Sequence, residues 1–215
     1  MLSDMLSLYL VTDPVLCGKR GVPETCRQAL QAGVKIIQLR DKTASNRDLL
    51  ETAIELKELC SLYNALFIIN DNVTVAISSN ADGVHLGQDD MSCKEAREML
   101  GRTAIIGISV RTPEEAVKAW EDGADYIAAN MIFQTDTKTD IAGPPLGLES
   151  IAELKKATPL PLIAIGGINA SNANIVRNSG ADGIAVVSAI MAADDVPSAV
   201  HSLGEHPGGH SSPGV

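Results

Sequence analysis

The sequence predicts a single-domain α/β fold, a (β/α)8 TIM barrel, and three observations lead to it. Eight short apolar runs alternate along the chain with longer segments of helical periodicity. The 215 residues suffice for one large domain and hardly for two. No GxGxxG motif follows the first apolar run, which disfavours the alternative of a doubly wound sheet. Eight βα units fit the small end of the barrel's size range, and we expect them to span residues 1–203.

The eight apolar runs are the expected barrel strands. Aromatic residues make up only 3% of the chain, so its core must be built from Ile, Leu, Val and Ala, which fill buried parallel strands. In chain order the runs are LYLVT (8–12), IIQLR (36–40), LFIIN (66–70), GVHLG (83–87), AIIGIS (104–109), YIAAN (126–130), LIAIG (162–166) and GIAVV (183–187).

The segments between these runs have recognisable helix ends, because most open with an N-cap residue or proline and close with glycine. A recurrent joint leads from helix to strand in AGVKIIQLR, NADGVHLG, DGADYIAA and SGADGIAVV, and its uneven spacing indicates βα units rather than a solenoid. The tail 204–215 lacks apolar periodicity, and we expect it to be disordered or vector-derived. We predict helices from Pro23 to Gly33, from Asn46 as N-cap to Tyr63, from Thr112 as N-cap through Pro113 to Gly123, and from Ser171 to Gly180.

Composition narrows the class of protein. A formal net charge of −10 argues against a nucleic-acid-binding or anionic-membrane-binding surface, because both need excess Lys and Arg. No apolar run approaches the ~20 residues that span a bilayer, and the N-terminal segment lacks the basic start of a signal peptide. The four cysteines show no CxxC spacing, which favours reduced thiols and a cytoplasmic location. Both a monomer and a homodimer fit this composition.

Polar side chains gather where the expected strands end. Barrel enzymes carry their chemistry at the C-terminal ends of the strands, whereas the helix-to-strand loops here hold mostly Ala, Gly, Asp and Pro. This asymmetry predicts a polar site at one mouth of the barrel. The residues concerned are Thr12, Asp13, Gln38, Arg40, Asp41, Lys42, Asn70, Asp71, His85, Gln88, Asp89, Asp90, Ser109, Arg111, Gly166, Gly167, Asn169 and Ser188.

Two of these acids could form a metal site. Asp71 and Asp90 follow neighbouring strands, and a carboxylate pair on one rim suits Mg²⁺, which takes one or two carboxylates plus phosphate oxygens and water. The alternative is that each caps the helix that follows it. Arg40 and Lys42 would then complete a metal–pyrophosphate clamp or form plain ion pairs.

The loops after the last strands suggest a phosphate site. AIGGIN (164–169) and VVSAI (186–190) follow the seventh and eighth strands, where barrels usually bind phosphate through backbone N–H groups, although tight packing of strand against helix also explains the glycines. The stretch NMIFQTDTKTD (130–140) reads alone as a solvated loop. Its place on the same rim favours an anion cradle. Ser109 and His85, by contrast, are commonly satisfied core residues.

Together these segments resemble the thiamine phosphate synthase family. The resemblance runs in order from about Leu8 to about Ile190, and QLRDK and LGQDDM are its most specific parts. The motifs that carry it are YLVTD (9–13), GVKIIQLRDK (33–42), FIINDNVTVA (67–76), ADGVHLGQDDM (81–91), GADYIAAN (123–130), TDTK (135–138), PLGLE (145–149), AIGGIN (164–169) and GADGIAVVSAI (180–190).

The resemblance implies a barrel enzyme that joins 4-amino-5-hydroxymethyl-2-methylpyrimidine diphosphate to 4-methyl-5-(2-phosphoethyl)thiazole. The products are thiamine phosphate and pyrophosphate, and the implied mechanism is dissociative, with pyrophosphate leaving first. By matching position, Asp71 and Asp90 would hold Mg²⁺. The pyrimidine diphosphate would contact Gln38, Arg40, Lys42, Asn70, Ser109 and Lys138, of which Arg40, Lys42, Ser109 and Lys138 would be catalytic. The thiazole phosphate would contact Thr135, Thr137 and the backbone of Gly167, Val187 and Ser188, and Leu39, Asp41 and Asp136 complete the substrate-binding set.

The chain departs from the family pattern at two places. Arg111 stands where many members have a histidine, and Asn130, Met131 and Gln134 replace the usual Gly-Pro and Pro after the sixth strand. These changes leave the phosphate and metal ligands named above intact and concern the fine geometry of the substrate pockets. Three alternatives are a thiazole tautomerase of the same superfamily, which relies on a histidine base, a non-catalytic thiamine-phosphate-binding regulator, and a sugar-phosphate isomerase or epimerase. The intact acidic pair and TDTK favour the synthase.

Overall fold

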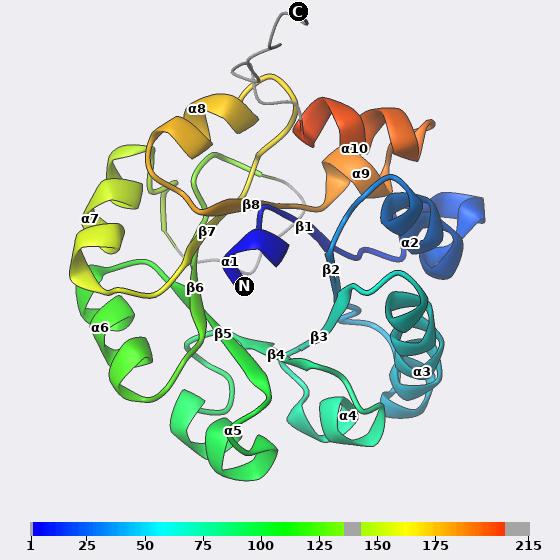
Figure 1. The fold of residues 1–215 in the computed structure, drawn as a ribbon, viewed down its shortest axis with the longest axis horizontal. Coiled ribbons are helices and arrows are strands. Elements are labelled where there is room, and N and C mark those ends of the chain that lie inside the picture. The colour runs from blue at the N-terminus through cyan, green and yellow to red at the C-terminus, as the bar shows by residue number, and fades with distance from the viewer. Residues whose placement is uncertain (1, 136–142, 205–215) are drawn as a thin grey trace, which may run out of the picture.

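The structure is a computed structural model that describes residues 2–135 and 143–204. Within these ranges, eight parallel strands close into a barrel in which each pairs with its neighbours along the chain and β8 pairs with β1 (Figure 1). The predicted fold class is therefore confirmed. The strands are β1 (Leu8–Val11), β2 (Ile36–Leu39), β3 (Leu66–Asn70), β4 (Gly83–Leu86), β5 (Ile105–Val110), β6 (Tyr126–Asn130), β7 (Leu162–Ile165) and β8 (Gly183–Val186).

Helices surround the barrel on the outside, and a short N-terminal helix lies across one end of it (Figure 1). Gly204, with which the predicted tail begins, is the last residue of α10, and the rest of that tail lies outside the described residues. The helices are α1 (Leu2–Met5), the 3-10 helix η1 (Gly18–Arg20), α2 (Val22–Gln31), α3 (Asn46–Leu62), α4 (Val73–Ser78), α5 (Cys93–Leu100), α6 (Pro113–Glu121), α7 (Glu149–Ala157), α8 (Ala173–Asn178), α9 (Ser188–Met191) and α10 (Val196–Gly204).

One of the two predicted N-caps and the predicted start of the helix after β7 need correction. Thr112 caps α6 as expected, since its side chain accepts a hydrogen bond from the N–H of Glu115. The N-cap of α3 is Ser45 and not Asn46, which is already helical. The residue before α8 is Asn172 and not Ser171. Neighbouring residues of good capping type compete at such boundaries, and tertiary packing decides between them.

The barrel has two apolar layers, because side chains on a strand alternate between its faces. Leu8 and Leu10 of β1 belong to the large cluster between strands and helices, whereas Tyr9 belongs to a smaller cluster inside the barrel. Leu6, which follows α1, joins the inner cluster and is fully buried. The end of the barrel next to α1 is therefore closed by packing, which leaves the other end for a site.

Three aspartates explain three of the four recurrent joints in the sequence. Asp82, Asp125 and Asp182 stand directly before β4, β6 and β8, and each accepts a hydrogen bond from a backbone N–H of the preceding strand. Each aspartate also forms an ion pair with a basic side chain of α3, α5 or α7, the helix that leads into the preceding strand. The carboxylates thus join a helix and two strands. The N–H groups belong to Phe67, Ile106 and Leu162, and the basic side chains to Lys57, Arg97 and Lys155.

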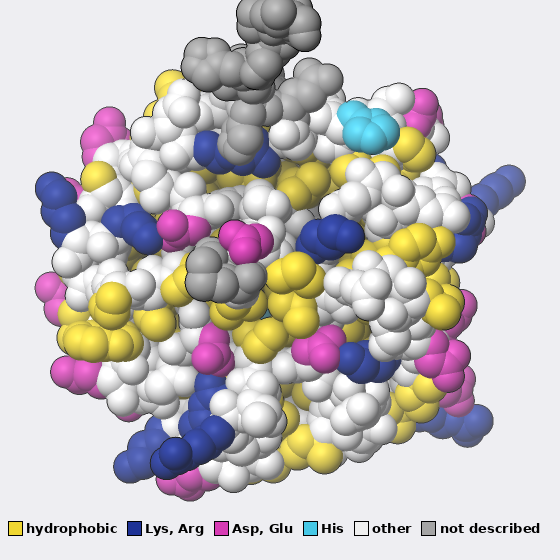
Figure 2. Space-filling view, viewed as in Figure 1, with side chains coloured by type: hydrophobic (Ala, Val, Ile, Leu, Met, Phe, Trp, Pro, Cys, Tyr) yellow, Lys and Arg dark blue, Asp and Glu magenta, His cyan; other side chains and the backbone are white. Residues whose placement is uncertain are grey.

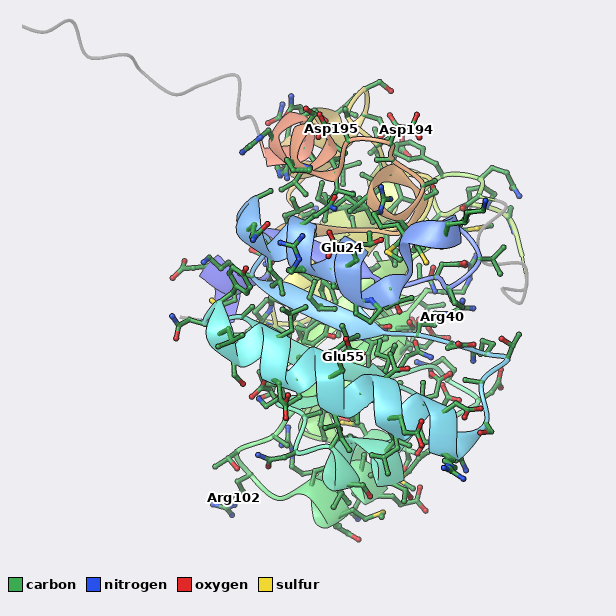
Figure 3. The ribbon with its side chains drawn as sticks, turned by 90° about the vertical axis from the view of Figure 1, so that its right-hand side faces the viewer. Glu24, Arg40, Glu55, Arg102, Asp194 and Asp195 are labelled. Atoms are coloured by element: carbon green, nitrogen blue, oxygen red, sulfur yellow. The ribbon has the colours of Figure 1, made fainter. Side chains whose placement is uncertain are left out.

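The two ends of the barrel differ. On the face around α1, charged side chains of both signs lie interspersed with hydrophobic ones (Figure 2). In the side view, α1 and Arg102 lie toward one end, and Arg40 lies toward the other, where the strands finish (Figure 3). No helix in the described part of the chain is long and apolar enough to cross a membrane.

Candidate functional site

A cavity opens at the C-terminal ends of the strands, where the polar residues of the sequence were expected to meet. Inward-facing side chains of β1 to β8 form its floor and walls, and the loops after β7 and β8 form one side. It brings together most of the predicted substrate-binding residues that the structure describes. These are Gln38, Arg40, Asn70, Ser109, Thr135, Gly167, Val187 and Ser188.

Two of the predicted binding residues have side chains that are engaged away from the cavity. Leu39 is buried in the outer cluster, so its side chain faces the helices and not the cavity. The Asp41 carboxylate accepts hydrogen bonds from the backbone of Thr43 and Ala44 and thus closes its own loop. These contacts hold the pKa of Asp41 below its usual range despite its partial burial. Backbone contacts from Leu39 and Asp41 stay a prediction. Asp136, Thr137 and Lys138 lie outside the described residues.

A chain of hydrogen bonds crosses the cavity floor. The Gln38 amide Nε2 donates to the Tyr9 hydroxyl over 2.8 Å, and the two tyrosine hydroxyls of Tyr9 and Tyr126 are 2.9 Å apart. His85 contacts the Tyr126 hydroxyl through Nδ1 at 3.0 Å and the Ser109 hydroxyl through Nε2 at 2.9 Å. His85 is therefore a satisfied buried residue, as its sequence context indicated. Burial raises the pKa of both tyrosines well above the ordinary value, so the phenols are neutral.

Sequence reasoning missed the two tyrosines. Their hydroxyl groups meet across 117 residues of chain, and only closure of the barrel brings β1 and β6 into that relation. A signal was nevertheless present. Side chains along a strand alternate between its two faces. Tyr9 and Tyr126 lie at positions whose side chains point into the barrel, as those of Gln38 and Ser109 do.

Asp71 and Asp90, the acidic pair, lie on the rim beside the cavity. Neither carboxylate caps the next helix, because Asn72 caps α4 and Ser92 caps α5. The Asp71 and Asp90 carboxyl groups are close enough to influence each other, and Lys42 Nζ lies 2.5 Å from Asp71 Oδ2. Burial, followed by the Asp90 carboxyl group, raises the pKa of Asp71, while Lys42 opposes that rise. Lys42 thus forms an ion pair in this structure, and its part in a metal–pyrophosphate clamp stays a prediction.

This pair fits a divalent cation that also takes ligands from a substrate. Among the described residues, no group of three or more His, Cys, Asp or Glu side chains is placed to hold a metal ion. However, proteins usually bind Mg²⁺ through one or two carboxylates, and the substrate and water supply the other ligands. Burial and the neighbouring Asp90 carboxyl group disfavour the charged form of Asp71, and a bound cation would relieve this. The backbone N–H of Gly87 holds the Asp90 carboxylate in place, since it donates a hydrogen bond to Asp90 Oδ2 over 2.7 Å.

The loop after β7 approaches the segment after β6 closely. Gly166 and Gly167 have φ angles of 106° and 65°, which favour glycine. A Cβ atom on Gly166 would lie 2.4 Å from Cβ of Met131, and one on Gly167 would lie 2.6 Å from the Gln134 carbonyl oxygen. The glycines therefore pack tightly, against the chain after β6 rather than against a helix. Gly167 also lines the cavity, so packing and anion binding are compatible there.

The loop after β8 completes this side of the cavity. Val187 is the N-cap of the short helix α9, which begins at Ser188, and both residues line the cavity. Asn172 supports the β7 side, because its Nδ2 donates to the Gly167 carbonyl over 2.9 Å. The two loops expected to bind phosphate therefore meet at one place.

Arg111 connects the departures from the family pattern. Its Nη1 donates to the Asn130 carbonyl and its Nη2 to the Pro144 carbonyl, both over 2.7 Å. Asn130 ends β6 and Pro144 belongs to the chain that returns toward α7, so one guanidinium joins both ends of the β6–α7 connection. Arg111 thus has a structural contact and does not face solvent alone.

Comparison with known proteins identifies the family. The family model described as thiamine monophosphate synthase matches residues 8–190. The chain belongs to the thiamine monophosphate synthase family. It is 47% identical to a thiamine-phosphate synthase of Psychrobacter sp. (strain PRwf-1), over 94% of this chain and 95% of the relative. It is 45% identical to that of Methanocella arvoryzae, over 91% and 92%.

A solved structure supports the same assignment. Thiamine phosphate pyrophosphorylase from Pyrococcus furiosus superposes with a TM-score of 0.85 at 41% identity, covering 94% of this chain and 96% of that one. Membership in the thiamine monophosphate synthase family makes the protein an enzyme, a transferase of thiamine biosynthesis that acts on small molecules.

Proposed function

We propose that this synthase condenses 4-amino-5-hydroxymethyl-2-methylpyrimidine diphosphate with 4-methyl-5-(2-phosphoethyl)thiazole, giving thiamine phosphate and pyrophosphate. The observation that carries the proposal is the arrangement of two residue sets, each suited to bind an anion, across one cavity. Arg40, Lys42 and the acidic pair lie at β2 to β4, and the Gly167 and Ser188 loops lie at β7 and β8. The strand order places these sets on opposite sides of the barrel.

The diphosphate belongs on the β2–β4 side. Arg40 lines the cavity there, and Lys42 contributes a second cation beside Asp71. Asp71 and Asp90 would hold Mg²⁺, which when bound supplies a Lewis acid that offsets negative charge on pyrophosphate oxygens. Because Lys42 pairs with Asp71 in this structure, we expect the lysine to turn toward the diphosphate when the carboxylates bind the ion.

The pyrimidine ring belongs on the cavity floor. Gln38 and Ser109 present polar groups at the two ends of the hydrogen-bond chain, and Ile163 and Ile165 contribute apolar walls. This placement leaves the thiazole between the pyrimidine and the β7–β8 loops, with its phosphate on the backbone N–H groups of those loops. Holding both substrates in one cavity converts a bimolecular reaction into an effectively unimolecular one.

The inventory of side chains suits a dissociative reaction. The C–O bond between the pyrimidine methylene carbon and the diphosphate breaks, and its electron pair leaves with pyrophosphate. The thiazole nitrogen then donates its lone pair to the resulting cation and forms the C–N bond. No cysteine, aspartate or glutamate lines the cavity among the described residues. Because the thiazole nitrogen is itself the nucleophile, this reaction needs only charge and position from the protein.

The tautomerase alternative is less well supported. It needs a histidine base, and position 111 is an arginine occupied with two backbone carbonyls. His85 does line the cavity, but both of its ring nitrogens take part in the hydrogen-bond chain. Its nitrogens are therefore engaged with the protein and not presented to a substrate.

The test is product formation by the purified protein. With both substrates and Mg²⁺ we expect thiamine phosphate in a mass spectrum, and absence of product with active substrates would contradict the proposal. Asp71→Asn should lower turnover, most strongly at limiting Mg²⁺, because it removes one carboxylate of the pair. Turnover that is unchanged at limiting Mg²⁺ would show that the metal assignment is wrong.

A further inference from the structure

The hydrogen-bond chain on the cavity floor joins two substrate-binding positions through residues that have no assigned role. Gln38 and Ser109 are its ends, and Tyr9, Tyr126 and His85 are its interior. Tyr9 and Tyr126 are fully buried. A chain of this kind is more than support, because each hydroxyl that accepts at one side donates at the other.

The Gln38 end sets the direction of the chain when each phenol accepts one hydrogen bond and donates one. An amide nitrogen can only donate, so the Tyr9 oxygen accepts from Gln38 Nε2, and on that premise the Tyr9 hydroxyl donates onward to the Tyr126 oxygen. The Tyr126 hydroxyl then donates to Nδ1 of His85. A neutral imidazole that accepts at Nδ1 carries its proton on Nε2, which donates to Ser109.

We propose that this chain makes Tyr126 and His85 positioning residues, which fix His85 as its Nε2–H tautomer and thereby leave the Ser109 hydroxyl as a hydrogen-bond donor toward the cavity. Were the direction reversed, the Ser109 hydroxyl would spend its hydrogen on Nε2 of His85. The chain therefore decides whether Ser109 meets an acceptor atom of the substrate, such as a ring nitrogen, with its O–H.

Gly107 leaves the space that the Tyr126 ring occupies inside the barrel. A Cβ atom on Gly107 would lie 2.0 Å from Cζ of Tyr126 and 2.3 Å from its hydroxyl oxygen, so the ring lies directly over a strand position that has no side chain. The imidazole of His85 stacks on the same ring, with centroids 5.6 Å apart and an interplanar angle of 28°. Packing on two sides thus holds the Tyr126 hydroxyl between Tyr9 and His85.

The direct test is the tautomer of His85 in the protein without substrates, measured from the ¹⁵N chemical shifts of its ring. The chain has four histidines, and a His85→Gln variant identifies the signal by its loss. The proposal expects a protonated Nε2 and an unprotonated Nδ1. A proton on Nδ1 would overturn it. This readout needs no turnover, so its failure is distinguishable from failure of the proposed reaction.

A reversal experiment sharpens the test. Gln38→Glu keeps the shape of the side chain but replaces the donor with an acceptor carboxylate, which the Tyr9 hydroxyl would then serve. Every later bond should reverse, and the His85 proton should move to Nδ1. If the ¹⁵N signals of this variant match those of the wild type, the direction of the chain does not set the tautomer and the proposal fails.

The functional part rests on the proposed contact between Ser109 and the pyrimidine, and kinetics test it. Tyr126→Phe removes one hydroxyl and should lower kcat/KM for the pyrimidine diphosphate about tenfold, which corresponds to one hydrogen bond. KM for the thiazole phosphate should stay unchanged. The matched control is Tyr63→Phe, outside the cavity, which should match the wild type. An equal effect of both variants, or an equal rise in both KM values for Tyr126→Phe, would contradict a positioning role.

Discussion

The guanidinium of Arg111 lies 2.7 Å from the carbonyl oxygen of Asn130, and both residues are departures from the family pattern. With its other nitrogen Arg111 reaches Pro144, so it bridges the start and the return of the chain between β6 and α7. Two substitutions that looked independent in the sequence are therefore in contact. The arginine supports the segment that carries Thr135 into the cavity.

Replacing Arg111 should impair substrate binding more than folding. Arg111→Ala removes two charge-assisted hydrogen bonds, and we expect kcat/KM for the thiazole phosphate to fall about tenfold or more. Arg111→Lys should not restore it, because an ammonium group cannot reproduce the planar fork. Arg102→Ala, at the opposite end of the barrel (Figure 3), is the control. If steady-state kinetics give wild-type rates for Arg111→Ala and Arg111→Lys, this role is contradicted.

The aspartates of the helix-to-strand joint should matter for stability rather than catalysis. Asp125→Ala leaves the N–H of Ile106 and the guanidinium of Arg97 without this acceptor, and should lower the free energy of unfolding by about 1–3 kcal/mol. Glu51→Ala breaks the exposed pair with Arg47 and should cost less than about 0.5 kcal/mol. Urea denaturation measures both values, and equal losses in the two variants would contradict the joint's importance.

Gly107 should tolerate no side chain. A Cβ atom at this position would overlap the Tyr126 ring, so Gly107→Ala must displace the ring or the strand. We expect a loss of about 1–3 kcal/mol in the free energy of unfolding, typical of an overpacked interior. The loss should come with a kcat/KM at least as low as that of Tyr126→Phe. A variant with wild-type stability and activity would show that the ring position is unimportant.

The buried thiols give the stability a dependence on alkaline pH. Burial raises the pKa of Cys60 from 9.0 to about 12 and that of Cys93 to about 11. The folded state therefore retains these protons where the unfolded state loses them. Stability from this source is complete below pH 9 and declines as the pH rises toward 11 or 12. Denaturation from pH 8 to 10.5 should show a shallower decline for Cys60→Ala, and identical slopes would refute this origin.

The barrel and most of its cavity could be predicted because both follow from alternation along single strands. An apolar run fixes where a strand lies, and its two-residue period puts Gln38 and Ser109 inside the barrel. What could not be predicted depends on distant pairing. The contact of Tyr9 with Tyr126 needs barrel closure, and the bond from Arg111 to Asn130 needs the exact path of a loop.

The central claim is that one cavity holds both substrates while the C–O bond breaks and the C–N bond forms. A single-turnover experiment tests it most directly. The enzyme is in excess over the pyrimidine diphosphate, and thiazole phosphate and Mg²⁺ are also present. The account predicts thiamine phosphate and pyrophosphate in equal amounts and at equal rates. Pyrophosphate released without thiamine phosphate, or neither product from substrates shown to be intact, would contradict it.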